Sequence, residues 1–297
     1  MQRPQEQTAF AAEETEACRR LTELALEEDL DAAGDLTSDV LIPPERIGAA
    51  VLVARQPGIL AGLPAAELTF ALVDPTLMFE TVRADGSLLQ PGDRLAVLSG
   101  RARSILRGER TALNFLQRLS GIATLTRRYV DAVAALPCRI LDTRKTMPAW
   151  RLMEKYAVRQ GGGHNHRLGL YDGILIKDNH LAALAGHAEP VAEAVQLARQ
   201  KHGTNVPLEI EVDTPAQLEI ALKAKPDMVL LDNMPPADLR EAVHRRNEAA
   251  PGVLLEASGG VTLDTIRAIA ESGVDRISVG ALTHSAPALD IGLDYLP

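Results

Sequence analysis

The stretch from Leu208 to Gly260 reads LEIEVDTPAQLEIALKAKPDMVLLDNMPPADLREAVHRRNEAAPGVLLEASGG, and it alternates short apolar runs with helical patterns. In chain order, these segments are Leu208–Val212, Pro215–Lys223, Met228–Leu231, Pro236–Glu248 and Val253–Leu255. Short strands separated by helical segments are typical of βα units, whose strands pair in parallel within one sheet. The stretch therefore predicts an α/β fold built on a parallel sheet.

The same alternation continues on both sides of this stretch. Further apolar runs and helical patterns lie at Arg139–Leu141, Ile174–Ile176, Glu189–Lys201, Leu263–Ser272 and Arg276–Val279. The six apolar runs together predict a sheet of about six parallel strands. Thr283–Pro297 does not continue the alternation, and we expect it to return to the first part of the chain.

The first third of the chain has a mixed pattern. Its predicted helices and strands are Cys18–Asp31, Ile47–Ala54, Pro64–Leu72, Phe79–Arg83, Arg94–Ser99 and Ser104–Ala135. Within the last of these, a long helix, we expect Ser120-Gly121 to cause a break or a kink. These patterns predict an N-terminal α/β domain over residues 1–120, joined by about 283–297, and a βα domain over residues 121–282.

The composition limits the classes of partner. The formal net charge of −9 argues against binding to nucleic acid or to a membrane surface, because both need a basic field. Two cysteines, Cys18 and Cys138, are too few for a disulfide framework and have no metal-binding spacing. Met1–Ala17 lacks the layout of a signal peptide, and no apolar run has the roughly 18 residues of a membrane span. We therefore expect a cytoplasmic protein.

Polar side chains follow each of the six apolar runs, which is where the catalytic groups of βα barrels lie. The cations among them are Arg144, Lys145 and Lys177, and His166-Arg167 joins them after the glycine run Gly161–Gly163. Several cations that converge in an acidic protein indicate a ligand with several negative charges. Arginine suits a planar carboxylate because its fork bonds both oxygens, whereas lysine suits a phosphate as a point charge.

Two acids and two glycine-containing turns complete the pattern. Glu211 and Asp232 lie on neighbouring strands, and beside a cationic pocket they indicate Mg²⁺, the hydroxyls of a sugar, or both. Ser258–Gly260 and Val279–Ala281 follow the late strands, where the phosphate sites of barrels lie. Their small residues would let backbone amides approach a phosphate.

Each of these features also has a purely structural interpretation. Arg144 and Lys145 could form a solvated surface pair. Glu211 and Asp232 could make ion pairs without any chemical role, and His166 could be structural. Ser258–Gly260 could be a simple turn between a strand and a helix. The shared position of all these groups at strand ends favours a functional site.

The segments resemble the quinolinate phosphoribosyltransferase family over nearly the whole chain. The most specific stretch is Ile140–His180, ILDTRKTMPAWRLMEKYAVRQGGGHNHRLGLYDGILIKDNH. The other matching segments are Glu27–Asp39 (EEDLDAAGDLTSD), Gly108–Thr124 (GERTALNFLQRLSGIAT), Glu209–Thr214 (EIEVDT), Val229–Asn233 (VLLDN) and Glu256–Val261 (EASGGV). The resemblance implies an open βα barrel of about six parallel strands, with an N-terminal α/β domain completed by the C-terminus.

The resemblance also implies an activity. The phosphoribosyl group of phosphoribosyl pyrophosphate would pass to quinolinate with decarboxylation, giving nicotinate mononucleotide, pyrophosphate and CO₂ on the route to NAD, with Mg²⁺ as cofactor. The protein would be a homodimer or a higher homo-oligomer whose active sites are shared between subunits.

Roles for single residues follow from the same resemblance. The residues implied for quinolinate are Thr143, Arg144, His166, Arg167 and Lys177, together with Arg110 of the partner subunit. Lys145, Glu211 and Asp232 would act on phosphoribosyl pyrophosphate, the two acids through Mg²⁺, directly or indirectly. The residues implied for the 5′-phosphate are Ser258, Gly259, Gly260, Val279, Gly280 and Ala281.

Three other functions remain compatible with these residues. A relative with the same architecture could accept nicotinate or a pterin-like ring. A Schiff-base lyase could use Lys177 as its nucleophile. A non-catalytic protein could bind anionic metabolites. Binding of quinolinate against nicotinate, borohydride trapping on Lys177 and steady turnover would distinguish them.

Overall fold

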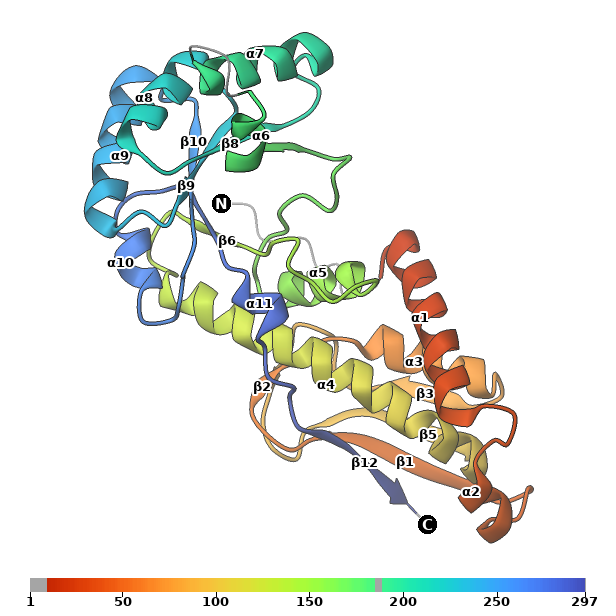
Figure 1. The fold of residues 1–297 in the computed structure, drawn as a ribbon. Helices are drawn as coiled ribbons and strands as arrows, with labels where there is room; N and C mark the ends of the chain where they lie inside the picture. Colours follow the sequence, from red (N-terminus) through yellow and green to blue (C-terminus); the bar gives the residue numbers. More distant parts are fainter. Residues whose placement is uncertain (1–9, 185–188, 297) are drawn as a thin grey trace. The chain divides into compact units, whose positions relative to one another are not determined.

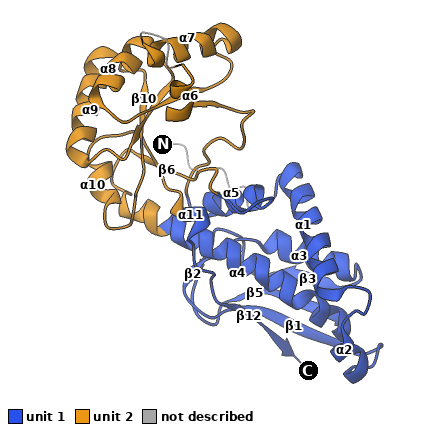
Figure 2. Ribbon diagram, in the orientation of Figure 1, with its two compact units in different colours: residues 1–127, 146–162, 282–297 blue, residues 128–145, 163–281 orange. Residues whose placement is uncertain are grey.

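The computed structural model describes residues 10–184 and 189–296, so the start of Met1–Ala17 and Pro297 lie outside the described residues. The chain divides into two compact units, coloured separately in Figure 2. Unit 1 comprises residues 1–127, 146–162 and 282–297, and unit 2 comprises residues 128–145 and 163–281. The sequence-based limits of 1–120 with about 283–297, and of 121–282, stay a prediction about independently folding domains.

Unit 1 contains a four-stranded antiparallel sheet with the strand order β12-β1-β5-β3 (Figure 1). Its strands are β1 (Ile47–Ala54), β3 (Met78–Thr81), β5 (Arg94–Arg101) and β12 (Ile291–Leu296). A small second sheet pairs β2 (Gly58–Ile59) with β4 (Leu88–Leu89). Because β12 pairs with β1, placing Ala50 opposite Tyr295, the expected return of the chain's end to its first part is confirmed.

Unit 1 also contains several helices. They are α1 (Ala12–Leu30), α2 (Leu36–Leu41), α3 (Leu63–Val73), α4 (Ala102–Ala132) and α5 (Arg151–Gln160). The short α11 (Ala281–His284) precedes the final strand. Apolar side chains of the sheet and of α3 and α4, such as Leu52, Leu98, Phe70 and Leu116, form one buried core. With so few aromatic residues in the chain, aliphatic side chains fill most of that core.

Helix α4 is continuous from Ala102 to Ala132, so the expected break at Ser120-Gly121 is wrong. The Ser120 hydroxyl accepts a hydrogen bond from the Ala61 amide and donates one to the Ala61 carbonyl, both at 3.0 Å. A Cβ atom on Gly121 would lie 2.0 Å from the carbonyl oxygen of Pro287. The pair therefore permits close packing against two neighbouring backbone segments, and it does not end the helix.

Unit 2 contains a six-stranded parallel sheet with the order β6-β11-β10-β9-β8-β7. Its strands are β6 (Arg139–Leu141), β7 (Ile174–Ile176), β8 (Leu208–Val212), β9 (Met228–Asp232), β10 (Leu254–Ser258) and β11 (Arg276–Ser278). Strand β10 extends beyond the predicted run Val253–Leu255 because its pairing with β9 continues as far as Ser258 opposite Asp232. The six parallel strands predicted from the sequence are confirmed.

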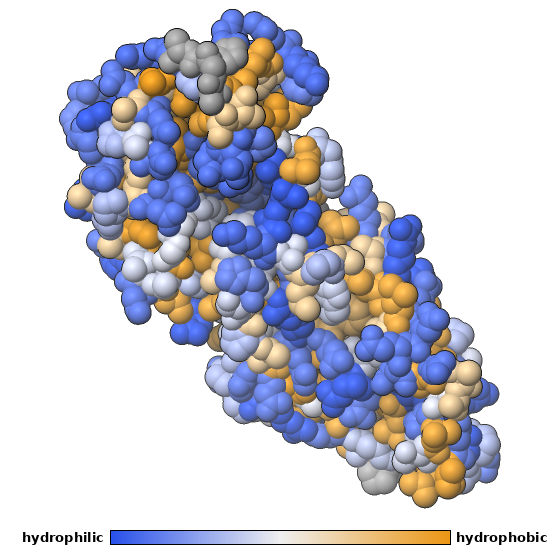
Figure 3. Space-filling model, in the orientation of Figure 1, coloured by the Kyte–Doolittle hydropathy of each residue, from blue (hydrophilic) through white to orange (hydrophobic). Residues whose placement is uncertain are grey.

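Helices follow most of these strands. They are α6 (Asp178–Ala182), α7 (Pro190–His202), α8 (Pro215–Ala224), α9 (Pro236–Ala249) and α10 (Ile266–Ala270). Helix α10 is shorter than the predicted Leu263–Ser272, because reciprocal hydrogen bonds between Thr262 and Thr265 form a turn before it. The outward surface of α8 and α9 is mainly hydrophilic (Figure 3), as expected for helices whose apolar faces cover a sheet.

Strands β6 and β7 are the two ends of the sheet order, so the barrel has an open seam between them. On the β6 side of this seam, His164 makes a parallel bridge with Leu141, and the chain then continues to β7. The segment 163–173, which connects this bridge to β7, therefore starts beside the unpaired edge of β6. None of the helices within the described ranges is both long and apolar enough to cross a membrane.

Candidate active site

A cavity of about 480 Å³ opens at the carboxyl ends of the strands of unit 2. It is lined by Thr143, Arg144, Lys145, His166, Arg167, Leu175, Lys177, Glu211, Leu230, Asp232, Asn233, Glu256, Ser258, Gly259, Gly260 and Ser278. Parallel strands end at one edge of their sheet, so residues far apart in the sequence meet there. The structure thus brings together most of the residues that the sequence singled out.

The alternation of side chains along each strand arranges the cavity in two levels. On β8, β10 and β11, Glu211, Ser258 and Ser278 line the cavity. Two residues earlier on the same strands, and therefore on the same face, lie Glu209, Glu256 and Arg276. Glu209 and Glu256 are almost completely buried. The upper level is open to a ligand, and a charged layer lies beneath it.

Lys177 and Glu211 form an ion pair at the upper level. The Lys177 Nζ donates to Glu211 Oε2 at 2.5 Å, from the end of β7 to the end of β8. The Lys177 amide donates to His180 Nδ1 at 2.9 Å, which fixes the backbone where α6 begins. A carboxylate of the protein itself therefore pairs with this lysine.

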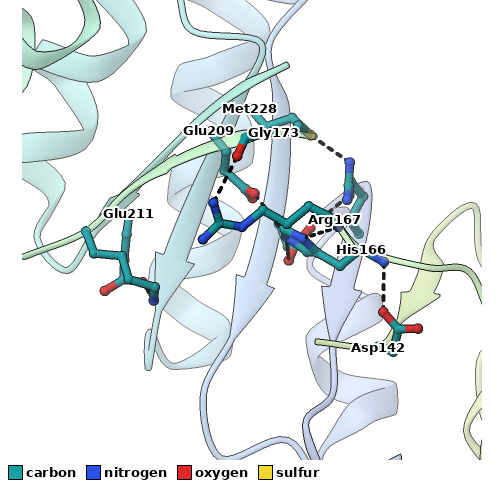
Figure 4. A network of polar contacts seen from close by, with 10 residues as sticks. Asp142, His166, Arg167, Gly173, Glu209, Glu211 and Met228 are labelled. Carbon is teal, nitrogen blue, oxygen red and sulfur yellow. Dashed lines mark hydrogen bonds and ion pairs between the residues drawn. The ribbon is translucent and has the colours of Figure 1, made fainter. Parts of the chain in front are cut away.

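The loop that carries His166 and Arg167 is fastened to the end of β6 by Asp142 (Figure 4). This fully buried carboxylate accepts hydrogen bonds from the His166 amide at 2.9 Å and from Asn165 Nδ2 at 2.6 Å. The Arg167 guanidinium donates to the Gly173 carbonyl at 2.9 Å. Burial and the nearby Arg144 guanidinium lower the pKa of Arg167, so the two arginines lie close enough to repel each other. An anionic ligand between them would relieve that repulsion.

His166 lies over the buried carboxylates of the lower level. Its Nε2 is 3.0 Å from Glu209 Oε2 and 3.4 Å from Glu256 Oε1. Burial disfavours the charged ring, but the hydrogen bonds to these carboxylates outweigh it and raise the pKa of His166 to about 9. The Arg167 amide donates to Nδ1 at 2.7 Å, however, and a proton on Nδ1 would face that N–H. The raised pKa favours a second ring proton, but the Arg167 N–H excludes it from Nδ1, so the ring is neutral and its proton lies on Nε2, next to the carboxylates.

The glycine turn after β10 depends on the absence of a side chain. Gly259 has φ of +93°, and a Cβ atom there would lie 2.1 Å from Asn233 Oδ1. Gly260 also has a positive φ, of +59°. Asn233, which the sequence did not single out, therefore packs directly against this turn and lines the cavity with it.

Four of the predicted site residues lie elsewhere. Arg110 is exposed on α4 of unit 1, and Val279, Gly280 and Ala281 follow β11 without lining the cavity described above. Val279 is buried, and its amide donates to the Leu141 carbonyl at 2.9 Å. The roles predicted for these four residues stay predictions.

Two sets of side chains could hold a metal ion. Among the described residues, the one cluster of three His, Asp or Glu ligand atoms is His166, Glu209 and Glu256. In this cluster the protein supplies the positive charge itself, because Arg276 Nε lies 2.8 Å from Glu256 Oε2. Glu211 and Asp232 face the cavity instead, and two carboxylates completed by ligand oxygens and water are typical of Mg²⁺ sites.

Comparison with known proteins places the fold and the cavity in one family. The models of the N-terminal and C-terminal domains of quinolinate phosphoribosyl transferase match residues 35–120 and 122–294. The chain is 43% identical to the nicotinate-nucleotide pyrophosphorylase (carboxylating) of Mycobacterium leprae, covering 95% of this chain and 98% of that protein. It is 44% identical to a probable enzyme of the same name from Bacillus subtilis, with 88% of each chain covered.

A solved structure agrees with these sequence matches. NadC from Streptococcus pyogenes superposes with a TM-score of 0.89 at 37% identity, covering 97% of this chain and 99% of that one. The sequence resemblance, the two matched domains and the strand-end cavity therefore lead to one conclusion: the chain belongs to the quinolinate phosphoribosyltransferase family.

Proposed function

We propose that this protein transfers the phosphoribosyl group of phosphoribosyl pyrophosphate to quinolinate with decarboxylation, as a step in NAD biosynthesis. The observation that carries the proposal is the composition of the cavity. Arg144, Lys145, Arg167 and Lys177 line it together with the acids Glu211 and Asp232. Quinolinate is a planar dicarboxylate, which arginine binds through two parallel hydrogen bonds. The co-substrate is a polyphosphate, which lysine can bind as a point charge.

The two arginines suit the acceptor. Their forks can each bond both oxygens of one carboxylate, which would fix the plane of the pyridine ring and present its nitrogen to the sugar. Lys177 would add a third positive charge once a substrate carboxylate competes with Glu211. Thr143 lies beside Arg144 at the same strand end and lines the same cavity.

The remaining charged groups suit the donor. Lys145 would stabilise the negative charge that develops on the departing pyrophosphate. Glu211 and Asp232 would stabilise the positive charge on the sugar as the glycosidic bond breaks, and they would hold Mg²⁺ directly or through water. When bound, Mg²⁺ would neutralise phosphate charge and orient the pyrophosphate as a leaving group.

The decarboxylation step requires no organic cofactor, because the charged ring nitrogen stabilises the electron pair that CO₂ leaves behind. The ring nitrogen attacks the sugar carbon, pyrophosphate leaves, and the pyridine nitrogen becomes positively charged. The carboxylate on the adjacent carbon then leaves as CO₂, and its bonding pair stays on that carbon next to the charged nitrogen. A proton takes the place of CO₂, which gives nicotinate mononucleotide.

We extend the proposal to assembly and location. The protein would act as a homodimer or higher homo-oligomer in which Arg110 of the partner subunit reaches the acceptor. Its support is that Arg110 is exposed on α4 and does not line the cavity of unit 2. A cytoplasmic setting is proposed from the acidic composition and the two unpaired cysteines.

Product analysis tests the proposed reaction. The protein would be mixed with Mg²⁺, phosphoribosyl pyrophosphate and quinolinate, and nicotinate mononucleotide, pyrophosphate and CO₂ would be measured in equal amounts. Nicotinate in place of quinolinate is the matched control, and it should give far less product because it lacks one carboxylate. Absence of both nucleotide and pyrophosphate would refute the proposal. The ion pair between Lys177 and Glu211 disfavours the Schiff-base alternative, because it engages the amine that would have to act as the nucleophile.

A further inference from the structure

A buried ionic layer lies beneath the cavity, and we define it as Glu209, Glu256 and Arg276. These residues come from β8, β10 and β11 and face the interior of the barrel. Glu256 and Arg276 are register neighbours on adjacent strands, and their Oε2 and Nε atoms are 2.8 Å apart. Carboxylates this deeply buried are stable only when they are paired and hydrogen-bonded. The layer therefore needs a further donor above it.

His166 provides that donor. Its Nε2 lies 3.0 Å from Glu209 Oε2, whereas Glu256 Oε1, at 3.4 Å, makes no hydrogen bond, so the N–H is directed to Glu209. The side chain of His166 is only 10% exposed, and it lies next to Glu209, which does not line the cavity, whereas Glu256 borders the cavity itself. Removing the imidazole would leave two buried carboxylates with one cation, Arg276, between them.

The second ring nitrogen is engaged as well. Nδ1 accepts the hydrogen bond of the Arg167 amide at 2.7 Å, and the backbone of His166 is itself held by Asp142. A neutral imidazole has one donor and one acceptor. Both are therefore used by the protein, and neither is directed to a ligand in the cavity. Arg167 is the next residue, and its guanidinium lines that cavity.

We propose that His166 is a positioning residue, which Glu209 holds through Nε2 and which in turn fixes the Arg167 backbone through Nδ1. This inference rests on the proposed function, because the ligand that Arg167 binds would be quinolinate. It changes the role implied for His166 by family resemblance: the imidazole orients the arginine and does not itself bind a substrate carboxylate. Glu209, which does not line the cavity, would act on the acceptor site through His166.

A double-mutant cycle distinguishes positioning from direct binding. The dissociation constant of quinolinate would be measured by calorimetry for the parent protein, His166→Gln, Arg167→Ala and the double variant. His166→Gln keeps a donor that can reach the layer and loses the acceptor for the Arg167 amide. Alone, it should weaken quinolinate binding about tenfold, the effect of roughly one hydrogen bond. In the Arg167→Ala background it should have almost no further effect, because no guanidinium remains to be positioned. Equal effects in both backgrounds would overturn the inference.

A spectroscopic measurement gives an independent readout. In protein labelled with ¹⁵N-histidine, the two ring-nitrogen shifts of His166 should report the Nε2–H form before and after quinolinate is added. A large shift of either nitrogen on binding would mean that the ring contacts the ligand, and the inference would be wrong. His166→Gln identifies the signals, and the exposed His244 serves as an internal reference.

The layer itself can be tested with a variant that keeps its shape. Glu209→Gln retains an oxygen for Nε2–H, removes the carboxylate that holds the ring, and leaves the pair of Glu256 with Arg276 intact. The KM for quinolinate should rise several-fold, while the KM for phosphoribosyl pyrophosphate and the melting temperature change little. An unchanged KM for quinolinate would show that the layer does not act on the acceptor site. If the parent protein itself bound no quinolinate and formed no product, the proposed function would fail. Additive effects in an active parent would refute only the positioning role.

Discussion

Lys177 Nζ and Glu211 Oε2 lie 2.5 Å apart at the ends of β7 and β8, so one of the cations proposed to bind the substrate is paired with one of the proposed catalytic acids. Under the proposed function, a substrate carboxylate that binds Lys177 would compete with Glu211 and release it toward the sugar. Binding of the acceptor would then be coupled to the freedom of a proposed catalytic group.

Glu211→Gln separates these two effects. The variant should bind quinolinate as tightly as the parent or more tightly, because Lys177 no longer has a competing carboxylate. Its turnover should nevertheless fall by about 10²-fold or more, as is typical when one electrostatic stabiliser of the transition state is lost. Calorimetry and steady-state rates measure the two quantities. Glu219→Gln, which disrupts an exposed pair with Lys223 on α8, is the matched control and should change neither. Weaker quinolinate binding in Glu211→Gln would show that Glu211 instead holds Lys177 in place for the substrate.

Arg144→Ala and Arg167→Ala should each weaken quinolinate binding by roughly 2–5 kcal/mol, the usual loss when one partner of a buried charge pair is removed. The affinity for phosphoribosyl pyrophosphate should change much less, because the two forks are assigned to the carboxylates of the acceptor. Calorimetry with each ligand alone is the measurement. Arg267→Ala, which removes an exposed pair with Glu271 on α10, should affect neither ligand. Equal losses for both ligands would contradict the assigned roles.

Arg110 and Lys145 allow a complementation experiment. Lys145→Ala and Arg110→Ala should each lower turnover by about 10²-fold. If Arg110 serves the partner subunit, a mixed dimer has one site with both defects and one site with neither. Random assembly makes about half of the dimers mixed, so roughly a quarter of all sites should be active. Turnover of a co-expressed mixture, purified through two different affinity tags, measures the recovery. Verified mixed dimers without activity would place Arg110 outside the partner's site.

Asp85 should be a main source of stability in unit 1. Its carboxylate accepts hydrogen bonds from the Gly62 amide at 2.6 Å, the Leu63 amide at 3.2 Å and the Tyr156 hydroxyl at 2.7 Å. Asp85→Ala leaves these buried donors without an acceptor and should cost about 3 kcal/mol or more in the free energy of unfolding. Tyr156→Phe removes one donor only and should cost about 1 kcal/mol. Urea unfolding measures both, and equal losses would contradict this account.

Cys18 provides a pH-dependent test of the core under α1. Burial raises the pKa of its thiol from 9.0 to about 11, and the weaker effects of Thr22 and Arg19 oppose this rise. Between these two values the folded protein keeps a proton that the unfolded chain has lost, so this contribution to stability falls as the pH rises. The difference in unfolding free energy between the parent and Cys18→Ala should therefore shift against the parent over that range. Cys138→Ala, at a half-buried position, should show a smaller trend. A difference independent of pH would contradict the burial of Cys18.

The strands of unit 2 could be predicted from the sequence because each is a short apolar run between turn-forming residues. The limits of β8, Leu208–Val212, agree with the prediction residue for residue. The cavity residues at the ends of these strands followed from the same reading, because parallel strands end at one edge. The break predicted at Ser120-Gly121 was wrong because serine and glycine also occur where a helix packs closely against another backbone segment. The sequence does not show that such segments, at Ala61 and Pro287, lie against the helix.

The ionic layer could not be predicted in the same way. Glu209 alternates with apolar neighbours, as an acid on the exposed face of a sheet would, and only closure of the barrel turns that face inward. Arg276 begins its strand and gives no local sign that it pairs with Glu256. For Arg110, the assigned partner lies on another chain, so no pattern within one sequence could establish its role.

The open seam between β6 and β7 has a consequence for how this enzyme can evolve. Along the open edge of β6, the described residues provide one bridge, from Leu141 to His164, and Asp142 fastens the next residues of the loop to that edge. The same segment carries His166 and Arg167. A substitution in this loop that changed the choice of acceptor would therefore also affect the hydrogen bonds that hold the loop to β6. New specificities in this scaffold are expected to arise first at Asn233, which borders the cavity just after β9 and lies outside the loop that makes this fastening.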